Sequence, residues 1–232
     1  MNILVTGSSR GIGKVIAQEL SSLGNVFVTG RNEELLKNSN CKYYVCDLSK
    51  DTDKLCEFIK ENNIDILINN AGEYIYGAIE EMSSKQIESI CATNLIAPIK
   101  LINACVPYMK SQKFGRIVNI GSISGVMGEA YASLYSSTKS GLIGLTKALA
   151  LELAEHNITV NTINPGWVDT DLGSRSIEES EFTKEEILET IPQRRFVEPI
   201  EVANLVKYLI SNEAKGVTGQ SINLCAGLSG GI

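Results

Sequence analysis

Short apolar runs alternate with longer stretches in which apolar residues recur at helical spacing, almost from one end of the chain to the other. The runs are rich in Ile and Val and are bounded by Gly, Asn or Pro, which is typical of buried strands. They predict strands over residues 3–6, 25–29, 42–46, 65–68, 116–120, 159–163 and 221–224. The stretches between them predict helices over residues 11–22, 52–62, 84–110, 133–156 and 200–210.

Strands that are apolar on both faces and alternate with helices indicate a parallel sheet that helices cover on both sides. No repeat or linker interrupts the alternation, so we expect one α/β domain over residues 1–232. The segment from about 166 to 198 lacks a clear strand and is too long for an ordinary connection, which indicates either a flexible flap or local disorder. Its charged residues indicate either a gate that selects substrates by charge or a helical face in contact with solvent. These residues include Glu178, Glu179, Glu181, Glu185, Glu186 and Glu189.

Composition narrows the possible functions. The formal net charge of -6 disfavours non-specific binding to nucleic acid or to an anionic membrane. Six cysteines without a C-x-x-C pair, and the single His156, predict reduced thiols and no metal site. The N-terminus has no signal-peptide pattern, and the apolar runs are far shorter than the roughly 20 residues of a membrane helix. We therefore expect a soluble, cytoplasmic protein.

A glycine-rich turn joins the first predicted strand to the first predicted helix. The sequence there is Thr6-Gly7-Ser8-Ser9-Arg10-Gly11-Ile12-Gly13, with the spacing G-x-x-x-G-x-G. Glycines allow a tight turn and a close approach of the backbone to a pyrophosphate, and the following helix directs free N–H groups at the anion. Because the turn follows the first strand directly, it predicts a dinucleotide site rather than a plain strand–helix junction.

The end of the second predicted strand bears on which nicotinamide cofactor binds. A site that prefers NAD has an acidic residue there, which holds the ribose hydroxyls. This strand ends in Thr29-Gly30-Arg31-Asn32, without an acid before Glu33. Arg31 and Arg10 are either solvated surface residues or partners of a 2′-phosphate. The missing acid and the added bases together predict that NADP(H) is preferred over NAD(H).

Candidate catalytic side chains lie at the carboxyl edge of the predicted sheet. Tyr135 and Lys139 are four residues apart on one helix, so they share a face. An adjacent ammonium lowers the pKa of a tyrosine, which is otherwise near 10. Ser122 follows a strand at the edge where open parallel sheets bind ligands, and is either a turn serine or a hydrogen-bond partner of a substrate carbonyl. The convergence of these residues favours proton-transfer chemistry.

With these motifs the chain resembles the short-chain dehydrogenase/reductase family over its full length. The matching elements, in family order, are TGSSRGIG, Asp47-Leu48, NNAG, Asn94 within TNL, Ser122, YSSTK and PGWVDTDL. The resemblance is greatest to 3-oxoacyl-acyl-carrier-protein reductases and polyketide ketoreductases. It implies a single-domain Rossmann fold: a doubly wound parallel sheet of about seven strands with helices on both faces.

The resemblance also implies roles for individual residues. Ser122 would polarise the carbonyl, Tyr135 would donate the proton, and Lys139 would bind the nicotinamide ribose and lower the pKa of Tyr135. Asn94 would hold a water linked to Lys139. Asp47 would meet the adenine, Asn70 the adenosine side and Thr170 the carboxamide. The expected cofactor-binding residues are Gly7, Ser9, Arg10, Gly11, Ile12, Gly13, Arg31, Asp47, Leu48, Asn70, Ala71, Gly72, Tyr135, Lys139, Pro165, Gly166, Val168 and Thr170.

We therefore expect an NADPH-dependent reductase of 3-oxoacyl thioesters, carried on acyl carrier protein or CoA. The segment 73–77 is more aromatic than the reductase pattern, which leaves a dehydrogenase of a sugar, polyol, steroid or other small alcohol as the alternative. A non-enzymatic dinucleotide sensor or structural protein is a third reading, which the four catalytic residues disfavour. The family further implies a homotetramer or a dimer built on the two long predicted helices.

Overall fold

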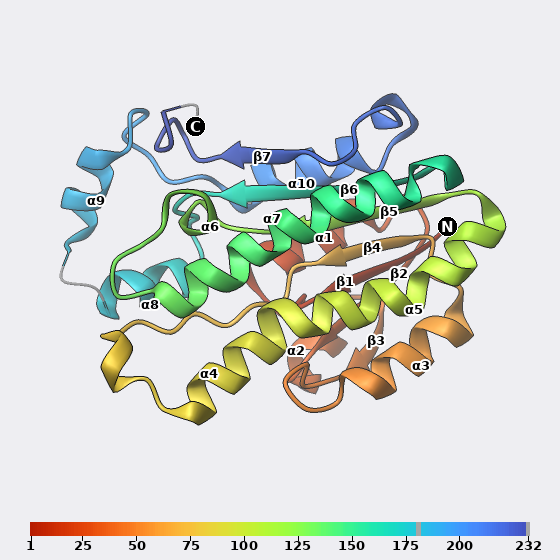
Figure 1. Ribbon diagram of the computed structural model, residues 1–232, viewed down its shortest axis with the longest axis horizontal. Coiled ribbons are helices and arrows are strands. Elements are labelled where there is room, and N and C mark those ends of the chain that lie inside the picture. Colours follow the sequence, from red (N-terminus) through yellow and green to blue (C-terminus); the bar gives the residue numbers. More distant parts are fainter. Residues whose placement is uncertain (180–181, 231–232) are drawn as a thin grey trace.

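The computed structural model describes residues 1–179 and 182–230 (Figure 1). Within them, one sheet of seven parallel strands has the order β3-β2-β1-β4-β5-β6-β7. The bounds are β1 Asn2–Thr6, β2 Asn25–Gly30, β3 Lys42–Val45, β4 Ile66–Asn69, β5 Gly115–Ile120, β6 Ile158–Pro165 and β7 Ser221–Leu224. Each predicted strand is confirmed to within two residues at either end. The single-domain Rossmann-like fold is also confirmed.

Helices connect the strands and cover both faces of the sheet. The longer ones are α1 Gly11–Leu20, α3 Thr52–Asn62, α4 Ser84–Cys91, α5 Ala97–Gln112, α7 Ser133–Leu153 and α10 Pro199–Leu209. The helix predicted over 84–110 is present, but a π-helical turn, Ala92–Ile96, divides it into α4 and α5. The shorter helices, which periodicity did not reveal, are α2 Glu33–Lys37, α6 Ser124–Met127, α8 Asp171–Glu179 and α9 Lys184–Thr190.

Alternate residues of each strand enter two separate cores. In β1, Ile3 and Val5 pack with α1 and α10 on one face, whereas Leu4 packs with α3, α5 and α7 on the other. In Figure 1, α3, α5 and α7 cross in front of the sheet and α1 and α10 lie behind it. Both faces are therefore dry, which explains why the strands are apolar throughout. The six cysteines are free thiols, as expected.

The continuous helical stretch Ser84–Gln112 is long and apolar enough to cross a membrane by length and composition alone. In this fold it is a core helix. Leu101 and Met109 of α5 are fully buried against the sheet and α3. Its apolar character is explained by this packing.

A buried polar network fixes α7 against the sheet. Thr146 of α7 shares a 2.6 Å hydrogen bond with Thr162 of β6 and accepts one of 2.9 Å from the amide of Asn119 in β5. Asn119 in turn accepts a 2.9 Å bond from Asn69 of β4. All four residues are buried. Because hydrogen bonds are directional, this chain sets the axial position of α7, and with it the residues at its N-terminal end.

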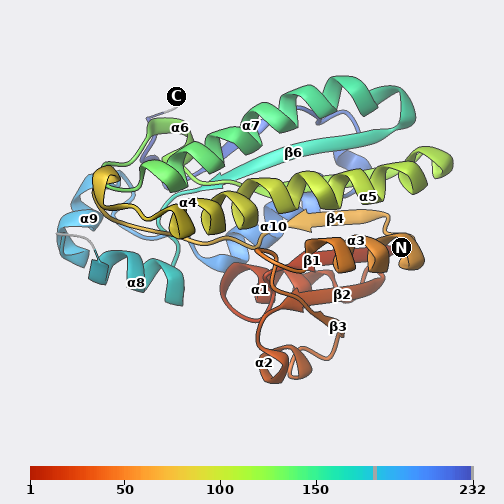
Figure 2. The ribbon, with the colours of Figure 1, turned by 60° about the horizontal axis from the view of Figure 1, so that its bottom comes forward.

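The segment over 166–198 folds into α8 and α9 beside the carboxyl ends of the strands (Figure 2). A parallel bridge between Val168 and Val197 closes its base. Ile187 of α9 is buried in the core, whereas Glu185 is exposed to solvent. The described part of this segment, called the flap below, is mainly helical, and Glu186 of α9 lines the cavity described below. Positions 180 and 181, including Glu181, lie outside the described residues.

Candidate active site

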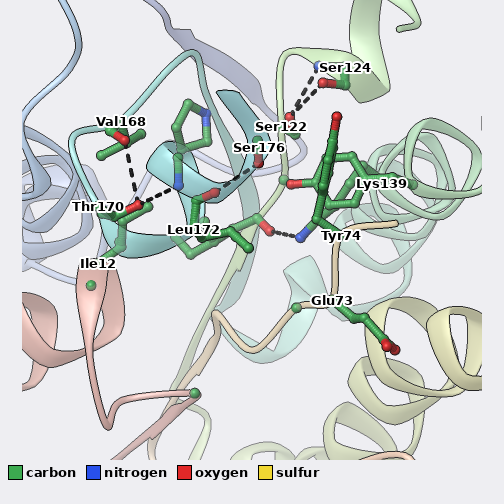
Figure 3. Close-up of a pocket in the computed structure, with 18 of the residues that line it drawn as sticks. Ile12, Glu73, Tyr74, Ser122, Ser124, Lys139, Val168, Thr170, Leu172 and Ser176 are labelled. Carbon is green, nitrogen blue, oxygen red and sulfur yellow. Dashed lines mark hydrogen bonds between the residues drawn. The ribbon is translucent and has the colours of Figure 1, made fainter. Parts of the chain in front are cut away.

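A cavity of about 600 Å³ lies along the carboxyl edge of the sheet, where β1, β2, β5 and β6 end (Figure 3). This volume suits a cofactor together with a small substrate. The predicted catalytic and cofactor residues line it, with two exceptions, Gly13 and Asn94. The flap closes one side through Leu172, Ser176 and Ile187.

The glycine turn is shaped by close backbone packing. Gly7 has a φ of +65°, and a Cβ atom there would lie 2.6 Å from the Cα of Ala71. Gly13 does not face the cavity, because a Cβ atom there would lie 2.5 Å from the carbonyl oxygen of Gly7. Helix α1 begins without a side-chain cap and without an acidic residue in its first turn. Its N-terminal N–H groups thus fit an anion, as a pyrophosphate requires.

Asn70 and Asp47, which are expected to contact the adenosine of the cofactor, also form hydrogen bonds within the protein. The amide of Asn70 donates to the carbonyls of Thr6 and Gly7, at 2.9 and 3.1 Å, so it holds the glycine turn in place. Asp47 accepts hydrogen bonds from the N–H and hydroxyl of Ser49, at 3.1 and 2.7 Å. Burial by itself would raise the pKa of Asp47, but the bonds from Ser49 together with the charges of Lys50 and Arg31 lower it on balance. Asp47 is therefore ionised at neutral pH.

Arg10 and Arg31 are exposed and line the same end of the cavity. Glu33 is the first acid after β2, but it does not line the cavity. Its carboxylate instead pairs with Lys37 at 3.1 Å and accepts a bond from Tyr43 at 3.2 Å. The end of β2 therefore presents a cation rather than a carboxylate to a bound dinucleotide.

Ser122, Tyr135 and Lys139 converge at the other end of the cavity. Ser122 donates to the hydroxyl of Ser124 at 3.2 Å. The ammonium of Lys139 donates to the carbonyl of Ile120 at 2.8 Å and lies 5.6 Å from the centroid of the Tyr135 ring. In Figure 3, Ser122 and Lys139 lie on the right of the pocket, away from Val168 and Thr170 on the left.

Asn94 lies in the π-helical turn and is fully buried. Its side chain accepts from the N–H of Glu73 and donates to the carbonyl of Glu73, both at 2.8 Å, and also donates to Thr138 at 3.2 Å. It thus ties the segment after β4 to α7, next to Lys139. Turns of π helix are frequent at functional sites, and this one allows the side chain to reach both partners.

Burial shifts the pKa values of Tyr135 and Lys139 in opposite directions. Burial raises the pKa of Tyr135 to about 12; a hydrogen bond with Ser122 opposes the rise and the nearby Glu129 adds to it. Burial lowers the pKa of Lys139 to about 8. The resulting pKa direction for Tyr135 is opposite to the predicted one, because burial outweighs the bond with Ser122. Tyr135 therefore keeps its proton at neutral pH.

Three residues that line the cavity, Tyr74, Ser124 and Glu129, form a hydrogen-bonded group that the sequence did not predict. Glu129 accepts hydrogen bonds from the hydroxyl of Tyr74 at 2.7 Å and from the hydroxyl of Ser124 at 2.6 Å. The rings of Tyr74 and Tyr135 meet edge to face, with centroids 5.0 Å apart. The aromatic segment 73–77 was the sequence signal for Tyr74, whereas no pattern marks Glu129.

Known proteins resemble this chain in sequence and in structure. A family model described as short chain dehydrogenase matches residues 1–181. The 3-oxoacyl-[acyl-carrier-protein] reductase of Buchnera aphidicola is 38% identical, with 97% of this chain and 96% of that protein covered. The corresponding reductase of Aquifex aeolicus is also 38% identical, with the same coverage. A crystal structure of a single-residue variant of the actinorhodin polyketide ketoreductase with NADPH has a TM-score of 0.92 at 35% identity, covering 98% of this chain and 96% of that one.

Proposed function

The chain belongs to the short-chain dehydrogenase family and is an NAD(P)-dependent oxidoreductase, and we propose that it reduces a ketone to a secondary alcohol with NADPH. The observation that carries this proposal is the convergence of Ser122, Tyr135 and Lys139 at one end of a cavity whose other end holds the glycine turn. The same convergence argues against a sensor without catalytic activity.

Each residue of the site has a separate role in the reduction of the carbonyl. The hydroxyl of Ser122 donates to Ser124 in this structure; with a substrate bound it would donate to the carbonyl oxygen instead and orient it. Tyr135, still protonated at neutral pH, transfers its proton to that oxygen as negative charge develops there. Lys139 would hold the nicotinamide ribose, and Asn94 keeps α7 next to the segment after β4. When bound, the cofactor supplies the hydride that reaches the carbonyl carbon.

We infer that the residues Gly7, Ser9, Arg10, Gly11 and Ile12 hold the pyrophosphate and that Arg31 selects NADPH. The uncapped N-terminus of α1 supports the first assignment, and the pairing of Glu33 with Lys37 supports the second. Pro165, Gly166, Val168 and Thr170 would bind the nicotinamide end; they line the cavity, and the carbonyl of Pro165 accepts a bond from the N–H of Ile123, next to Ser122.

Replacing Arg31 with alanine is expected to weaken NADPH binding by about 10- to 100-fold and to leave NADH binding unchanged, since a charge-assisted hydrogen bond to the 2′-phosphate would be lost. Titration of each cofactor followed by its fluorescence measures this. The matched control is Lys215→Ala, which removes one exposed cation outside the cavity. If the binding of NADPH and NADH weakened equally, or the binding of NADPH did not weaken, Arg31 would not bind the 2′-phosphate.

The rate of reduction is expected to fall as the pH rises through about 8, because Lys139 then loses its proton while Tyr135, with a pKa of about 12, keeps its own. Below that pH both groups are protonated and the rate should level off. The measurement is kcat/KM against pH from about 6 to about 10 with a 3-oxo ester, which reports the groups of the free enzyme. A flat profile across this range would contradict the role of Lys139.

For the substrate we propose a 3-oxoacyl thioester on acyl carrier protein or CoA, supported by the relatives that are named for this activity. The test follows the absorbance of NADPH, and separately of NADH, with acetoacetyl-CoA as the probe. Rapid oxidation of NADPH supports the proposal; no thioester activity despite tight NADPH binding would overturn it. A polyol or other hydroxylated small alcohol is the second candidate, and the carboxylate of Glu129 in the cavity favours it.

We also propose a cytoplasmic protein that forms a homotetramer or a dimer. Exposed apolar side chains on the two long helices support self-association. Leu151 of α7 is 86% exposed, and Ile96 and Ile99 are exposed near the start of α5.

A further inference from the structure

Glu129 is linked to the proposed catalytic residues by a chain of hydrogen bonds. One carboxylate oxygen accepts from Tyr74 at 2.7 Å and the other from Ser124 at 2.6 Å. Ser124 in turn accepts from Ser122 at 3.2 Å. Glu129 is therefore two hydrogen bonds away from the hydroxyl proposed to hold the substrate carbonyl.

These contacts do not use up the capacity of the carboxylate. A carboxylate accepts about four hydrogen bonds, and these two neighbours provide one to each oxygen. Glu129 lines the cavity and is only partly buried. Burial and the bond to Glu129 both raise the pKa of Tyr74, so its hydroxyl stays a donor and keeps the carboxylate in place. The remaining lone pairs can accept from a molecule in the cavity.

Charges along the cavity are unevenly distributed. The lining cations are Arg10 and Arg31 at the cofactor end, together with Lys139, whose ammonium is bonded to a main-chain carbonyl. Among the described residues, the lining beyond Ser122 and on the flap contains acids and no further cation: Glu73, Glu129, Asp171 and Glu186. A substrate with a carboxylate meets like charge here, whereas a hydroxyl or ammonium group meets an acceptor.

We propose that Glu129 determines substrate specificity: it accepts a hydrogen bond from a hydroxyl or ammonium group on the carbon β to the reacting ketone and disfavours ketones that carry a carboxylate. Tyr74 and Ser124 position it. The proposal rests on the proposed reduction at Ser122 and Tyr135, and it applies equally to a polar acyl thioester and to a free hydroxy ketone.

The test compares three small ketones with NADPH as the reductant. 4-Hydroxybutan-2-one carries the donor, pentan-2-one is its isostere without the donor, and levulinate carries a carboxylate. For the wild-type protein, kcat/KM should be about 10-fold higher for the hydroxy ketone than for pentan-2-one, and lowest for levulinate. Glu129→Gln should remove most of the preference for the hydroxy ketone and raise kcat/KM for levulinate about 10-fold. A misfolded variant cannot produce that gain.

The matched control is Glu185→Gln, which makes the same change on the exposed face of α9 and outside the cavity lining. It should leave the order of the three ketones unchanged. Tyr74→Phe removes one of the two bonds to the carboxylate and should weaken the preference without abolishing turnover.

A binding measurement separates this proposal from the proposed reaction. Saturation-transfer NMR on the complex with NADP+ reports ketone binding without turnover. Selective binding of the hydroxy ketone that is lost in Glu129→Gln, without NADPH oxidation, would overturn the reaction and support the specificity site. Turnover of all three ketones at equal efficiency would overturn the specificity site and support the reaction. If the protein neither bound nor reduced any of the ketones, both the specificity site and the proposed reaction would be overturned.

Discussion

Replacing Tyr135 with phenylalanine is expected to lower kcat by about 1,000-fold, within the range of general acid catalysis, and to leave NADPH binding near the wild-type level. The hydroxyl is the proposed proton donor, and burial raises its pKa to about 12, so the wild-type residue is protonated at neutral pH. Phenylalanine keeps the ring, and with it the edge-to-face contact with Tyr74. The loss should therefore appear in turnover rather than in folding.

Steady-state NADPH oxidation and cofactor fluorescence together measure this effect. Tyr208→Phe is the matched control, because Tyr208 lies half-exposed on α10 and does not line the cavity. It should behave like the wild type in both measurements. If Tyr135→Phe kept more than a tenth of the wild-type kcat, Tyr135 would not be the proton donor.

The second large effect is expected at Gly13. An alanine Cβ there would lie 2.5 Å from the carbonyl oxygen of Gly7 and would also press on the amide of Asn70. Neither neighbour can move freely, because that amide already bonds to the carbonyls of Thr6 and Gly7. Helix α1 must therefore shift away from the turn. We expect Gly13→Ala to destabilise the protein by about 1–3 kcal/mol and to weaken NADPH binding by at least about 10-fold.

Urea denaturation and NADPH titration measure the two consequences of this substitution. Gly144→Ala is the matched control, because Gly144 lies exposed in α7 and a Cβ atom there meets no atom within 4 Å. It should be as stable as the wild type or more stable by up to about 1 kcal/mol, since alanine favours the helix. If the two variants unfolded at the same urea concentration, the close packing of α1 on the glycine turn would not matter for stability.

The parts of the site that depend on local spacing could be predicted from the sequence. The glycine turn lies between a strand and a helix that are adjacent in the chain, and Tyr135 and Lys139 share a helix face because they are four residues apart. Ser122 could be placed because it follows a strand directly. In each case the short-range geometry of one element, or of one junction, determines where the side chain points.

The parts that depend on contacts between distant segments could not be predicted. Glu129 and Tyr74 are separated by 55 positions, and nothing near either residue indicates that they form a hydrogen bond. The upward shift in the pKa of Tyr135 depends on burial and on the nearby Glu129, both of which arise from tertiary packing. The helices α2, α8 and α9 are too short for their periodicity to stand out from the turns around them.

The central claim is that the cavity reduces a ketone carbonyl, and isotope transfer tests it most directly. NADPH deuterated at the transferable position of nicotinamide C4 is incubated with acetoacetyl-CoA and with 4-hydroxybutan-2-one, and the products are analysed by mass spectrometry and NMR. The account predicts one deuterium on the carbinol carbon of the alcohol formed, and no such product from Tyr135→Phe on the same timescale. NADPH that remains bound and unchanged in the presence of both ketones, with no deuterated alcohol, would contradict it.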